Sequence, residues 1–255
     1  MQLQAHRGVS TEFPENTMPS FQASVDQGYP IIELDPGVTK DGVCVVLHDD
    51  TLNRTCRLPN GDPIPETLPV SELTYEEVLQ YDAGLHKGPA FRGTVVPRLS
   101  DVLELAAQAD ILVKLDNKFQ RFTPWQKERF FETVAASRAR VAFTCANAEM
   151  VAMVVERFPE AEIHYDGYVD EEKVLHIQSL LKRNPYTVWL GLPSPLISWV
   201  QVPTATPELC AMVKRHATLG IWILETQEQL AQAEQLGADI VETTGSLKPA
   251  ANPNH

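Results

Sequence analysis

The chain has 255 residues, of which 44% are hydrophobic and 22% are charged. No stretch approaches the roughly 20 consecutive apolar residues of a membrane span, and the formal net charge of −13 disfavours nucleic-acid backbones and anionic membranes as partners. We therefore expect no nucleic-acid partner and no stable membrane insertion. The start, MQLQAHRG, has neither the basic end nor the apolar core of a signal peptide, which predicts a cytoplasmic protein.

The four cysteines are scattered along the chain and form no CxxC pair. Closely spaced pairs are typical of zinc sites and of redox motifs, so their absence from the sequence argues against both. We expect four reduced and mostly buried thiols.

Short apolar runs alternate with amphipathic stretches, a pattern typical of parallel βα units in an α/β protein. Eight runs are predicted to be strands, and a further extended run follows the second of them at Val43–Leu47. The eight are Leu3–Ala5, Ile31–Asp35, Ile111–Asp116, Val141–Thr144, Glu162–Tyr165, Thr187–Leu190, Gly220–Leu224 and Asp239–Glu242.

The stretches between these strands have helical periodicity and helix-ending signals. Pro124 suits the first turn of one helix, and Gly237 suits the end of the last. The predicted helices are Met18–Gln27, Leu99–Ala107, Thr123–Arg138, Glu149–Arg157, Glu171–Arg183, Pro207–His216 and Gln227–Leu236.

Two irregular stretches interrupt the alternation. Asp49–Pro97 is rich in proline, glycine and aspartate, with one short helical piece near Ser71–Tyr81. So long a connection is usually functional or separately folded, although a surface excursion without substrate contact is the alternative. Pro193–Pro203 is predicted to be an exposed loop with several apolar residues. These residues could line a pocket or contact a partner subunit, so the oligomeric state stays open.

Polar clusters stand at the ends of the early strands. His6 and Arg7 end one apolar run, Glu33 and Asp35 end the next, and His48 ends a third. Glu33 and Asp35 are two residues apart, so their side chains point to the same side of a strand. Two such carboxylates repel each other unless a cation lies between them, and hard oxygen ligands suit Mg²⁺ or Ca²⁺. A solvated strand end is the alternative, but the flanking residues are apolar.

The strings HRG, PENT, ELD, TKDG and VVLHDDTLNRT lie in this order within the N-terminal part of the chain. With them the sequence resembles the glycerophosphodiester phosphodiesterase family, and the resemblance continues more faintly through LVKLDNK and GIWILETQEQLAQAEQLGADIVETTG. It implies one (β/α)8 TIM barrel over residues 1–255, with a small insertion after the second strand. Residues 49–97 would then be an insertion subdomain over the barrel mouth that shapes the alcohol side of the substrate pocket.

The resemblance also implies a set of metal ligands. Glu33, Asp35 and Asp116 would hold one divalent metal ion, Mg²⁺ or Ca²⁺. Relatives typically have Glu-x-Lys at the third position, whereas this chain has Asp116 followed by Asn and Lys118. The shorter carboxylate reaches about one methylene less far. Alternatively, Asp116 only forms an ion pair with Lys118 or Lys114.

Catalytic and substrate-binding roles follow from the same resemblance. His6 and His48 would act as an acid/base pair, because histidine exchanges a proton near neutral pH. Arg7 offers a planar fork of donors to a phosphate and Lys118 a point charge. Trp222 would pack against the glycerol carbons, or it would be an ordinary core tryptophan.

The implied reaction is hydrolysis of a small-molecule glycerophosphodiester to an alcohol and glycerol 3-phosphate. In related enzymes the glycerol 2-hydroxyl attacks first, and water then opens the cyclic phosphate. Two alternatives stay open: a lyase that releases the cyclic phosphate, and a weakly catalytic binding protein for phosphodiesters or sugar phosphates. Glu242, near the end of the last strand, either approaches the site or forms an ion pair with Lys118.

Overall fold

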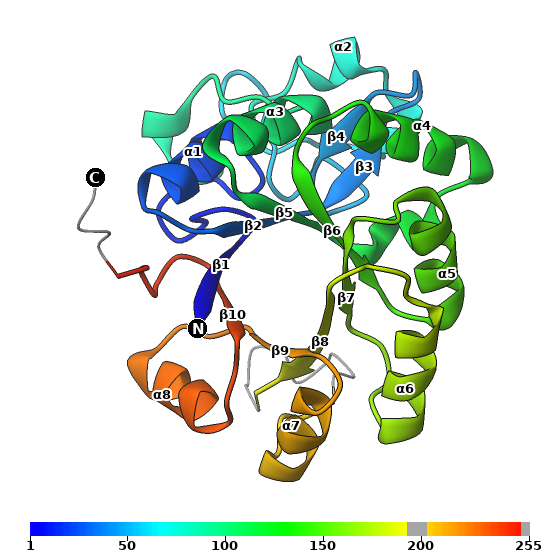
Figure 1. Cartoon of the computed structure of the whole chain (residues 1–255). Coiled ribbons are helices and arrows are strands. Elements are labelled where there is room, and N and C mark those ends of the chain that lie inside the picture. The colour runs from blue at the N-terminus through cyan, green and yellow to red at the C-terminus, as the bar shows by residue number, and fades with distance from the viewer. Residues whose placement is uncertain (193–202, 251–255) are drawn as a thin grey trace.

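A computed structural model describes residues 1–192 and 203–250 of the chain. Eight parallel strands form a closed barrel in the order β1-β2-β5-β6-β7-β8-β9-β10, with β10 pairing back to β1 (Figure 1). This confirms the predicted α/β barrel. The strands are β1 (Gln2–His6), β2 (Ile31–Leu34), β5 (Leu112–Leu115), β6 (Arg140–Cys145), β7 (Glu162–Tyr165), β8 (Tyr186–Gly191), β9 (Thr218–Trp222) and β10 (Ile240–Thr243).

Helices surround the barrel, as Figure 1 shows, and they alternate with the strands along the chain. Thr123 caps one of them by accepting a hydrogen bond from the Gln126 backbone N–H, and Pro124 occupies its first turn as predicted. The surrounding helices are α1 (Met18–Asp26), α3 (Leu99–Ala109), α4 (Pro124–Ala135), α5 (Ala148–Arg157), α6 (Glu171–Leu180), α7 (Pro207–Lys214) and α8 (Gln227–Gln235).

Alternation along each strand separates two environments. On β5, Val113 and Leu115 are fully buried in the main hydrophobic core, which also contains the buried apolar residues of the surrounding helices. Leu112 instead belongs to a small cluster with Ile31, Ala142, Trp189 and Ile240, each from a different strand. Because side chains of one strand alternate between its two faces, the first set packs under the helices and the second fills the barrel interior.

Part of the barrel interior is polar. Lys114 Nζ lies 3.0 Å from Glu242 Oε2, and it also lies 3.9 Å from the centre of the Trp189 ring. Gln4 donates a hydrogen bond to the same carboxylate. Burial disfavours the charge of Lys114, but Glu242 and Glu33 outweigh this and raise the pKa of Lys114. A buried ion pair therefore lies next to the inner tryptophan, between the strands β5 and β10.

Gly220 on β9 makes room for Trp189, which is 1% exposed. A Cβ atom at position 220 would lie 2.5 Å from the nearest atom of the Trp189 ring, so Gly220→Ala must displace the tryptophan. We expect the substitution to lower the free energy of unfolding by about 1–3 kcal/mol, as overpacking of a core does. Urea unfolding measures it. Gly37→Ala is the matched control, because its Cβ would meet its nearest neighbour at 3.4 Å. Equal stability of the two variants would contradict the packing argument.

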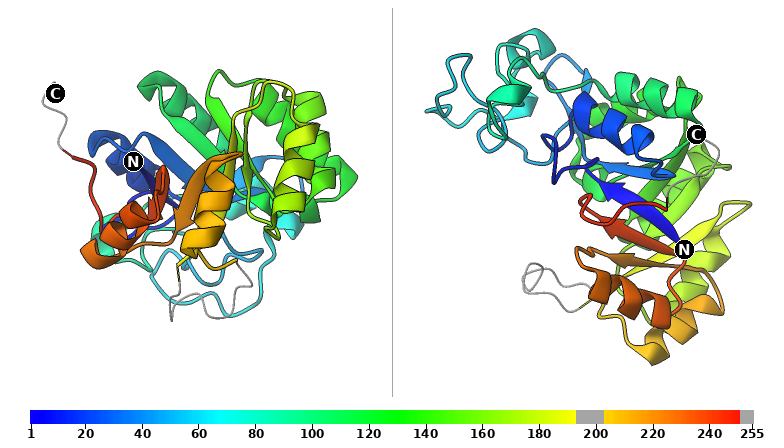
Figure 2. Two further views of the ribbon diagram at one scale, coloured as in Figure 1. Left: turned by 60° about the horizontal axis from the view of Figure 1, so that its bottom comes forward. Right: turned by 90° about the vertical axis from the view of Figure 1, so that its left-hand side faces the viewer.

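The long connection between β2 and α3 begins with an antiparallel pair outside the barrel, β3 (Pro36–Val38) with β4 (Cys44–Val46). The predicted run Val43–Leu47 is this second strand. Short helices follow at η1 (Val70–Glu72), α2 (Tyr75–Val78) and η2 (Pro89–Phe91). The segment has a hydrophobic cluster of its own, which includes Leu52, Cys56 and Val78. In the right-hand view of Figure 2 it lies at the opposite end of the barrel from the N-terminus.

Several smaller expectations have clear outcomes. All four cysteines are free and buried. No helix within residues 1–192 and 203–250 is long and apolar enough to cross a membrane. The expected strand Gly220–Leu224 lies two residues earlier, at Thr218–Trp222. The prediction for the loop Pro193–Pro203 falls almost entirely on residues 193–202, outside the described part of the chain.

Candidate active site

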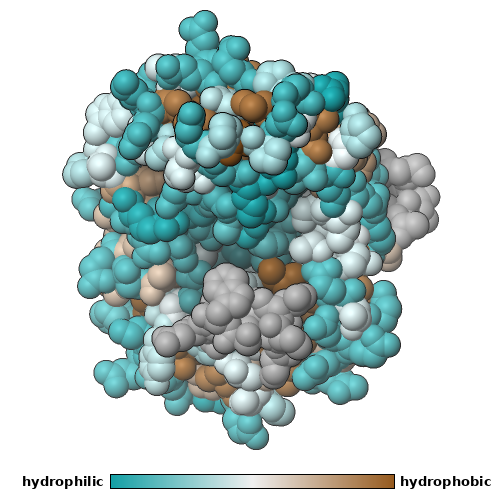
Figure 3. Space-filling model, turned by 180° about the vertical axis from the view of Figure 1, so that it is seen from behind, coloured by the Kyte–Doolittle hydropathy of each residue, from teal (hydrophilic) through white to brown (hydrophobic). Residues whose placement is uncertain are grey.

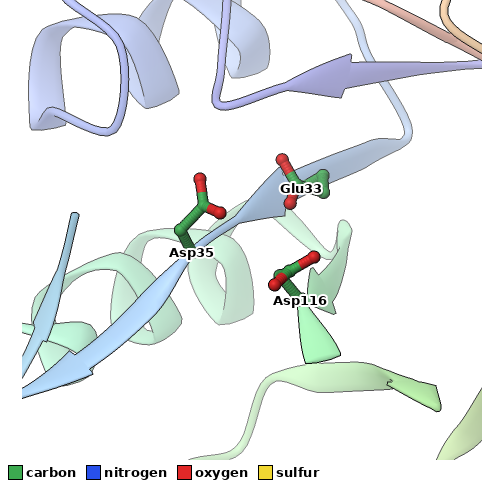
Figure 4. Close-up of side chains that lie close together, drawn as sticks. All are labelled: Glu33, Asp35 and Asp116. Carbon is green, nitrogen blue, oxygen red and sulfur yellow. The ribbon is translucent and has the colours of Figure 1, made fainter. Parts of the chain in front are cut away.

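Three carboxylates converge at the carboxyl ends of β2 and β5. Glu33 lies on β2, Asp35 follows this strand, and Asp116 follows β5 (Figure 4). One oxygen of each lies within 4.8 Å of the others. The backbone N–H of Asp116 donates to the Leu34 carbonyl at 3.0 Å, which continues the strand pairing and holds Asp116 beside β2. The structure therefore brings together the three predicted metal ligands.

The pKa values of two of these carboxyl groups are raised, because burial and the closeness of three negative charges disfavour their ionisation. Burial raises the pKa of Glu33 well above its usual range, and the charges of Asp35, Glu242 and Asp116 raise it further. Burial also raises the pKa of Asp116 to about 7, with repulsion from Asp35 added. Without a counter-charge, some of these oxygens hold protons at neutral pH.

Asp35 is the exception among the three. Burial opposes its ionisation, but Arg7 and Lys118 outweigh burial and lower the pKa of Asp35. Lys118 Nζ lies 3.6 Å from Asp35 Oδ1, and Asn16 Nδ2 donates to Asp35 Oδ2 at 2.7 Å. Asp35 therefore stays charged whether or not a cation is bound.

The donor set fits a hard divalent cation. It consists of carboxylate oxygens only, which Mg²⁺ and Ca²⁺ prefer. The alternative that Asp116 pairs only with a lysine finds no support among the described residues: Lys114 contacts Glu242, and Lys118 Nζ contacts Asp35 and the Leu47 carbonyl. Among the described residues, Asp116 Oδ1 accepts a hydrogen bond from the backbone N–H of Lys118 alone, at 3.1 Å.

His6 and Arg7 reach the carboxylates from the end of β1. His6 Nε2 lies 3.9 Å from Glu33 Oε2, and burial lowers the pKa of His6. The backbone N–H of Arg7 donates to Glu33 Oε2 at 3.0 Å, and Arg7 Nε lies 3.3 Å from Asp35 Oδ2. Arg7 Nη1 donates to Glu15 Oε1 at 3.0 Å, and within residues 1–192 and 203–250 no hydrogen bond uses Arg7 Nη2.

The loop after β1 has an unusual backbone. Arg7 and Asn16 have φ values of 57° and 56°, in the left-handed region that non-glycine residues seldom adopt. The backbone N–H of Asn16 donates to the Arg7 carbonyl at 3.0 Å. Gly8 also has a positive φ, and a Cβ there would collide with Ser20. The strings HRG and PENT thus form one structural unit, and such strain commonly accompanies a functional site.

His48 lies two residues after the end of β4, directly before the insertion. Its Nδ1 lies 2.6 Å from Asp49 Oδ1. A carboxylate accepts hydrogen bonds, so it favours the hydrogen on Nδ1 and leaves Nε2 for proton exchange. His48 therefore has the same kind of carboxylate support that orients catalytic histidines in other enzymes.

Two predicted side chains have more complex surroundings. Trp222 ends β9 and packs against the cluster in the barrel interior. Its Nε1 is buried without a hydrogen-bond partner among the described residues, so its two interpretations both remain. Glu242 approaches His6 closely enough to affect its pKa. The alternative ion pair between Glu242 and Lys118 is wrong, because the partner of Glu242 is Lys114, which reaches it from the middle of β5.

Four polar residues near the site were missed in the sequence. Glu15 and Asn16 belong to the PENT string and Arg54 to the HDDTLNRT string, so these strings were the available signal. Asp166 follows β7 and accepts a hydrogen bond from Asn117 Nδ2 at 2.8 Å. Burial raises the pKa of Asp166 to about 6. Its only signal was its place at a strand end.

The site opens at the end of the barrel that carries these strand ends. In Figure 3, which views the molecule from this end, hydrophilic side chains gather in a central hollow. Beside it, a cavity of about 220 Å³ lies between the insertion and the segment after β5. Its walls include Leu47, Asp49, Val70, Lys118 and Phe122. Lys118 thus contacts Asp35 of the carboxylate cluster and also lines the cavity.

Comparison with known proteins agrees with this geometry. The model of the glycerophosphoryl diester phosphodiesterase family matches residues 6–243. The chain belongs to this family. A glycerophosphodiester phosphodiesterase of Caldanaerobacter subterraneus subsp. tengcongensis is 41% identical over 114 residues, which are 45% of this chain and 44% of that protein. Another, from Bacillus altitudinis, is 35% identical over 133 residues, 51% of each chain. The matched segment spans about half the length of these curated relatives.

Solved structures show the same fold. A phosphodiesterase of Oleispira antarctica, described in complex with its product sn-glycerol-3-phosphate, superposes with a TM-score of 0.75 at 19% identity and covers 96% of this chain and 94% of that one. A glycerophosphoryl diester phosphodiesterase of Parabacteroides distasonis has a TM-score of 0.71 at 22% identity, with 99% and 88% covered. At these identities the family's barrel is what the two structures share with this chain.

Proposed function

We propose that the protein hydrolyses glycerophosphodiesters to an alcohol and glycerol 3-phosphate with one divalent metal ion. One observation carries the proposal: three carboxylates, two of them buried, meet two histidines and the side chains of Arg7 and Lys118 at one barrel mouth. The family to which the chain belongs supports the same reaction class. A cytoplasmic location stays a prediction from the sequence.

In this proposal Glu33, Asp35 and Asp116 hold the metal. Bound there, a divalent cation neutralises negative charge on the phosphate as it builds up in the transition state. Arg7 and Lys118 both contact Asp35, so each lies beside the proposed metal site and adds a positive charge for the phosphate. Preorganised charges of this kind commonly supply much of the rate enhancement of an enzyme.

The two histidines exchange protons with the reacting oxygens. His6 is held beside Glu33 at the end of β1, whereas His48 is held by Asp49 at the base of the insertion. They therefore reach the site from two separate segments, as attack and departure on opposite sides of phosphorus require. One takes a proton from the attacking hydroxyl and the other gives a proton to the leaving alcohol.

The insertion, residues 49–97, is proposed to shape the alcohol side of the pocket. It carries Asp49 and one wall of the cavity of about 220 Å³, whose other wall contains Lys118. An alcohol group that leaves a phosphate bound near Lys118 would lie in or beside this cavity. Trp222 lies across the barrel on β9 and is proposed to contact the glycerol carbons.

A coupled assay for glycerol 3-phosphate tests the function. We expect turnover of at least one of the choline, ethanolamine, glycerol and inositol diesters, complete loss of turnover after chelation, and recovery with Mg²⁺ or Ca²⁺. Full activity after exhaustive chelation and dialysis would refute the metal assignment. ³¹P NMR of the product distinguishes a hydrolase from a lyase, because a lyase accumulates the cyclic phosphate. Binding without turnover of any diester would favour a binding protein.

A further inference from the structure

Arg54 of the insertion lies between two carboxylates that belong to different parts of the chain. Its Nε donates to Asp49 Oδ2 at 2.8 Å and its Nη2 to Asp49 Oδ1 at 3.0 Å. Its Nη1 donates to Glu15 Oε2 at 3.0 Å and its Nη2 to Glu15 Oε1 at 2.7 Å. All three guanidinium nitrogens are used, and both contacts are bidentate, which is the geometry that arginine forms best.

Each of these carboxylates also holds a residue of the proposed site. Asp49 Oδ1 lies 2.6 Å from His48 Nδ1, and Glu15 Oε1 accepts from Arg7 Nη1 at 3.0 Å. The result is a continuous chain of contacts, His48–Asp49–Arg54–Glu15–Arg7. It connects the insertion with the loop after β1.

Both carboxylates are charged in this arrangement. Burial opposes the ionisation of Glu15, but the hydrogen bond from Arg54 and the charge of Arg7 lower its pKa to about 2. Burial likewise opposes that of Asp49, but hydrogen bonds from Arg54 and His48 lower its pKa to about 2. Two negative charges facing each other need the cation between them. Arg54 is therefore the group on which this part of the chain of contacts depends.

The two residues at the ends of this series of contacts, His48 and Arg7, are held in place to different degrees. Arg7 follows a barrel strand, and its backbone N–H is bound to Glu33. The His48 side chain is 38% exposed and directly precedes the insertion, whose residues pack in a separate hydrophobic cluster. Among the described residues, Asp49 is the only hydrogen-bond partner of the His48 ring. The orientation of His48 relative to the barrel half of the site therefore depends on how Asp49 is held.

We propose that Arg54 is a positioning residue that fixes His48 relative to Arg7 by holding Asp49 and Glu15 together. The inference rests on the proposed function, since it assigns His48 and Arg7 to one reaction. Without Arg54, Asp49 is free to turn to solvent, and Glu15 keeps Arg7 as its cationic partner among the described residues. His48 then loses its orientation, and Arg7 is drawn from the phosphate toward Glu15.

Kinetics of Arg54→Gln and Arg54→Lys provide the first test. We expect Arg54→Gln to lower kcat/KM by about 10–100-fold, the range typical of residues that orient a metal ligand or catalytic group, with metal affinity and melting temperature near those of the wild type. Arg54→Lys restores the charge but not the double fork, so it should recover only part of the loss. Arg157→Gln is the matched control, because Arg157 also forms an exposed bidentate contact, with Glu128 on a neighbouring helix. Its Nη1 donates to Glu128 Oε2 at 3.1 Å.

Two-bond ¹⁵N–¹H spectra of the histidines provide a second test that needs no turnover, with the His48 signals identified by their loss in His48→Ala. The neutral ring should carry its hydrogen on Nδ1 in the wild type and change toward the mixture of free imidazole in Arg54→Gln. An unchanged His48 spectrum, or a kcat/KM within twofold of the wild type, would overturn the positioning role. If the wild type turns over no diester, the proposed function is wrong. The histidine spectra then still test whether Arg54 fixes the orientation of His48.

Discussion

Replacing His6 or His48 by alanine is expected to lower kcat by about 10²–10⁴-fold, the usual contribution of a general acid or base. Metal binding should persist in both variants, because neither imidazole belongs to the set of three carboxylates. The coupled glycerol 3-phosphate assay measures kcat, and titration calorimetry measures the metal affinity. A variant that keeps more than about a tenth of the wild-type kcat would remove that histidine from the acid/base pair.

A substrate with an activated leaving group separates the two roles. From a 4-nitrophenyl diester the leaving group is 4-nitrophenolate, which departs without needing a proton, so loss of the general acid costs little with this substrate. The alanine variant whose defect shrinks with the 4-nitrophenyl diester lacks the acid, and the variant whose defect persists lacks the base. Equal defects of both variants with both substrates would contradict the division of roles. His176→Ala is the control, since His176 is an exposed residue of α6, and its kcat should stay at the wild-type value.

Asp116→Asn is expected to weaken the binding of Mg²⁺ and Ca²⁺ by more than about 100-fold, above the 10–100-fold typical of residues behind the ligands. The substitution keeps the size of the side chain and the acceptor for the Lys118 backbone N–H, but removes the charge. Asp116→Glu keeps the charge and should retain the metal. Wild-type affinity in Asp116→Asn would mean that the third ligand lies elsewhere.

The pH dependence of metal binding has a definite sign. Burial and the charge of Asp35 raise the pKa of Asp116 to about 7, so below this pH a proton competes with the cation. Affinity should rise with pH and level off above about 7, and at pH 6 it should be roughly tenfold weaker than at pH 8. A flat affinity over this range would contradict protonation of the cluster.

Stability provides an independent readout of the same charges. At pH 8 the metal-free Asp116→Asn protein should melt at a higher temperature than metal-free wild type, because one of three mutually repelling negative charges is gone. Mg²⁺ or Ca²⁺ should then raise the melting temperature of the wild type only, since binding stabilises the folded state alone. Asp110→Asn is the matched control. Asp110 ends α3 in a left-handed conformation that asparagine also adopts.

The barrel was predictable because its strands are marked locally. Each inward or outward position is set by alternation, and the buried outward residues, such as Val113 and Leu115, are apolar. The predicted bounds of β9 were two residues too late because they relied on the same local signal, a run of apolar residues. The apolar run continues to Leu224, but the pairing with β8 ends where Gly191 meets Trp222. Strand ends depend on the neighbouring strand, which a run of apolar residues does not report.

The carboxylate cluster was predictable from strand ends and from a family resemblance, whereas the ionic contacts around it were not. Arg54 and Glu15 lie 39 residues apart, and Lys114 and Glu242 lie 128 residues apart. Charged residues of these types also occur all over the surface, so composition does not single out partners. Only the closed barrel brings Glu242 of the last strand next to Lys114.

The hydrophobic cluster that contains Leu52 and Val78 is separate from the main core of the barrel. Substitutions at distant sites without shared partners have nearly additive effects on stability. We therefore expect the effects of substitutions around Leu52 or Val78 on stability to add to those of substitutions under β2 and β5, without coupling to the packing that holds the three carboxylates. In this way an insertion of different sequence is expected to be exchangeable for residues 49–97 while the proposed metal ligands stay in place.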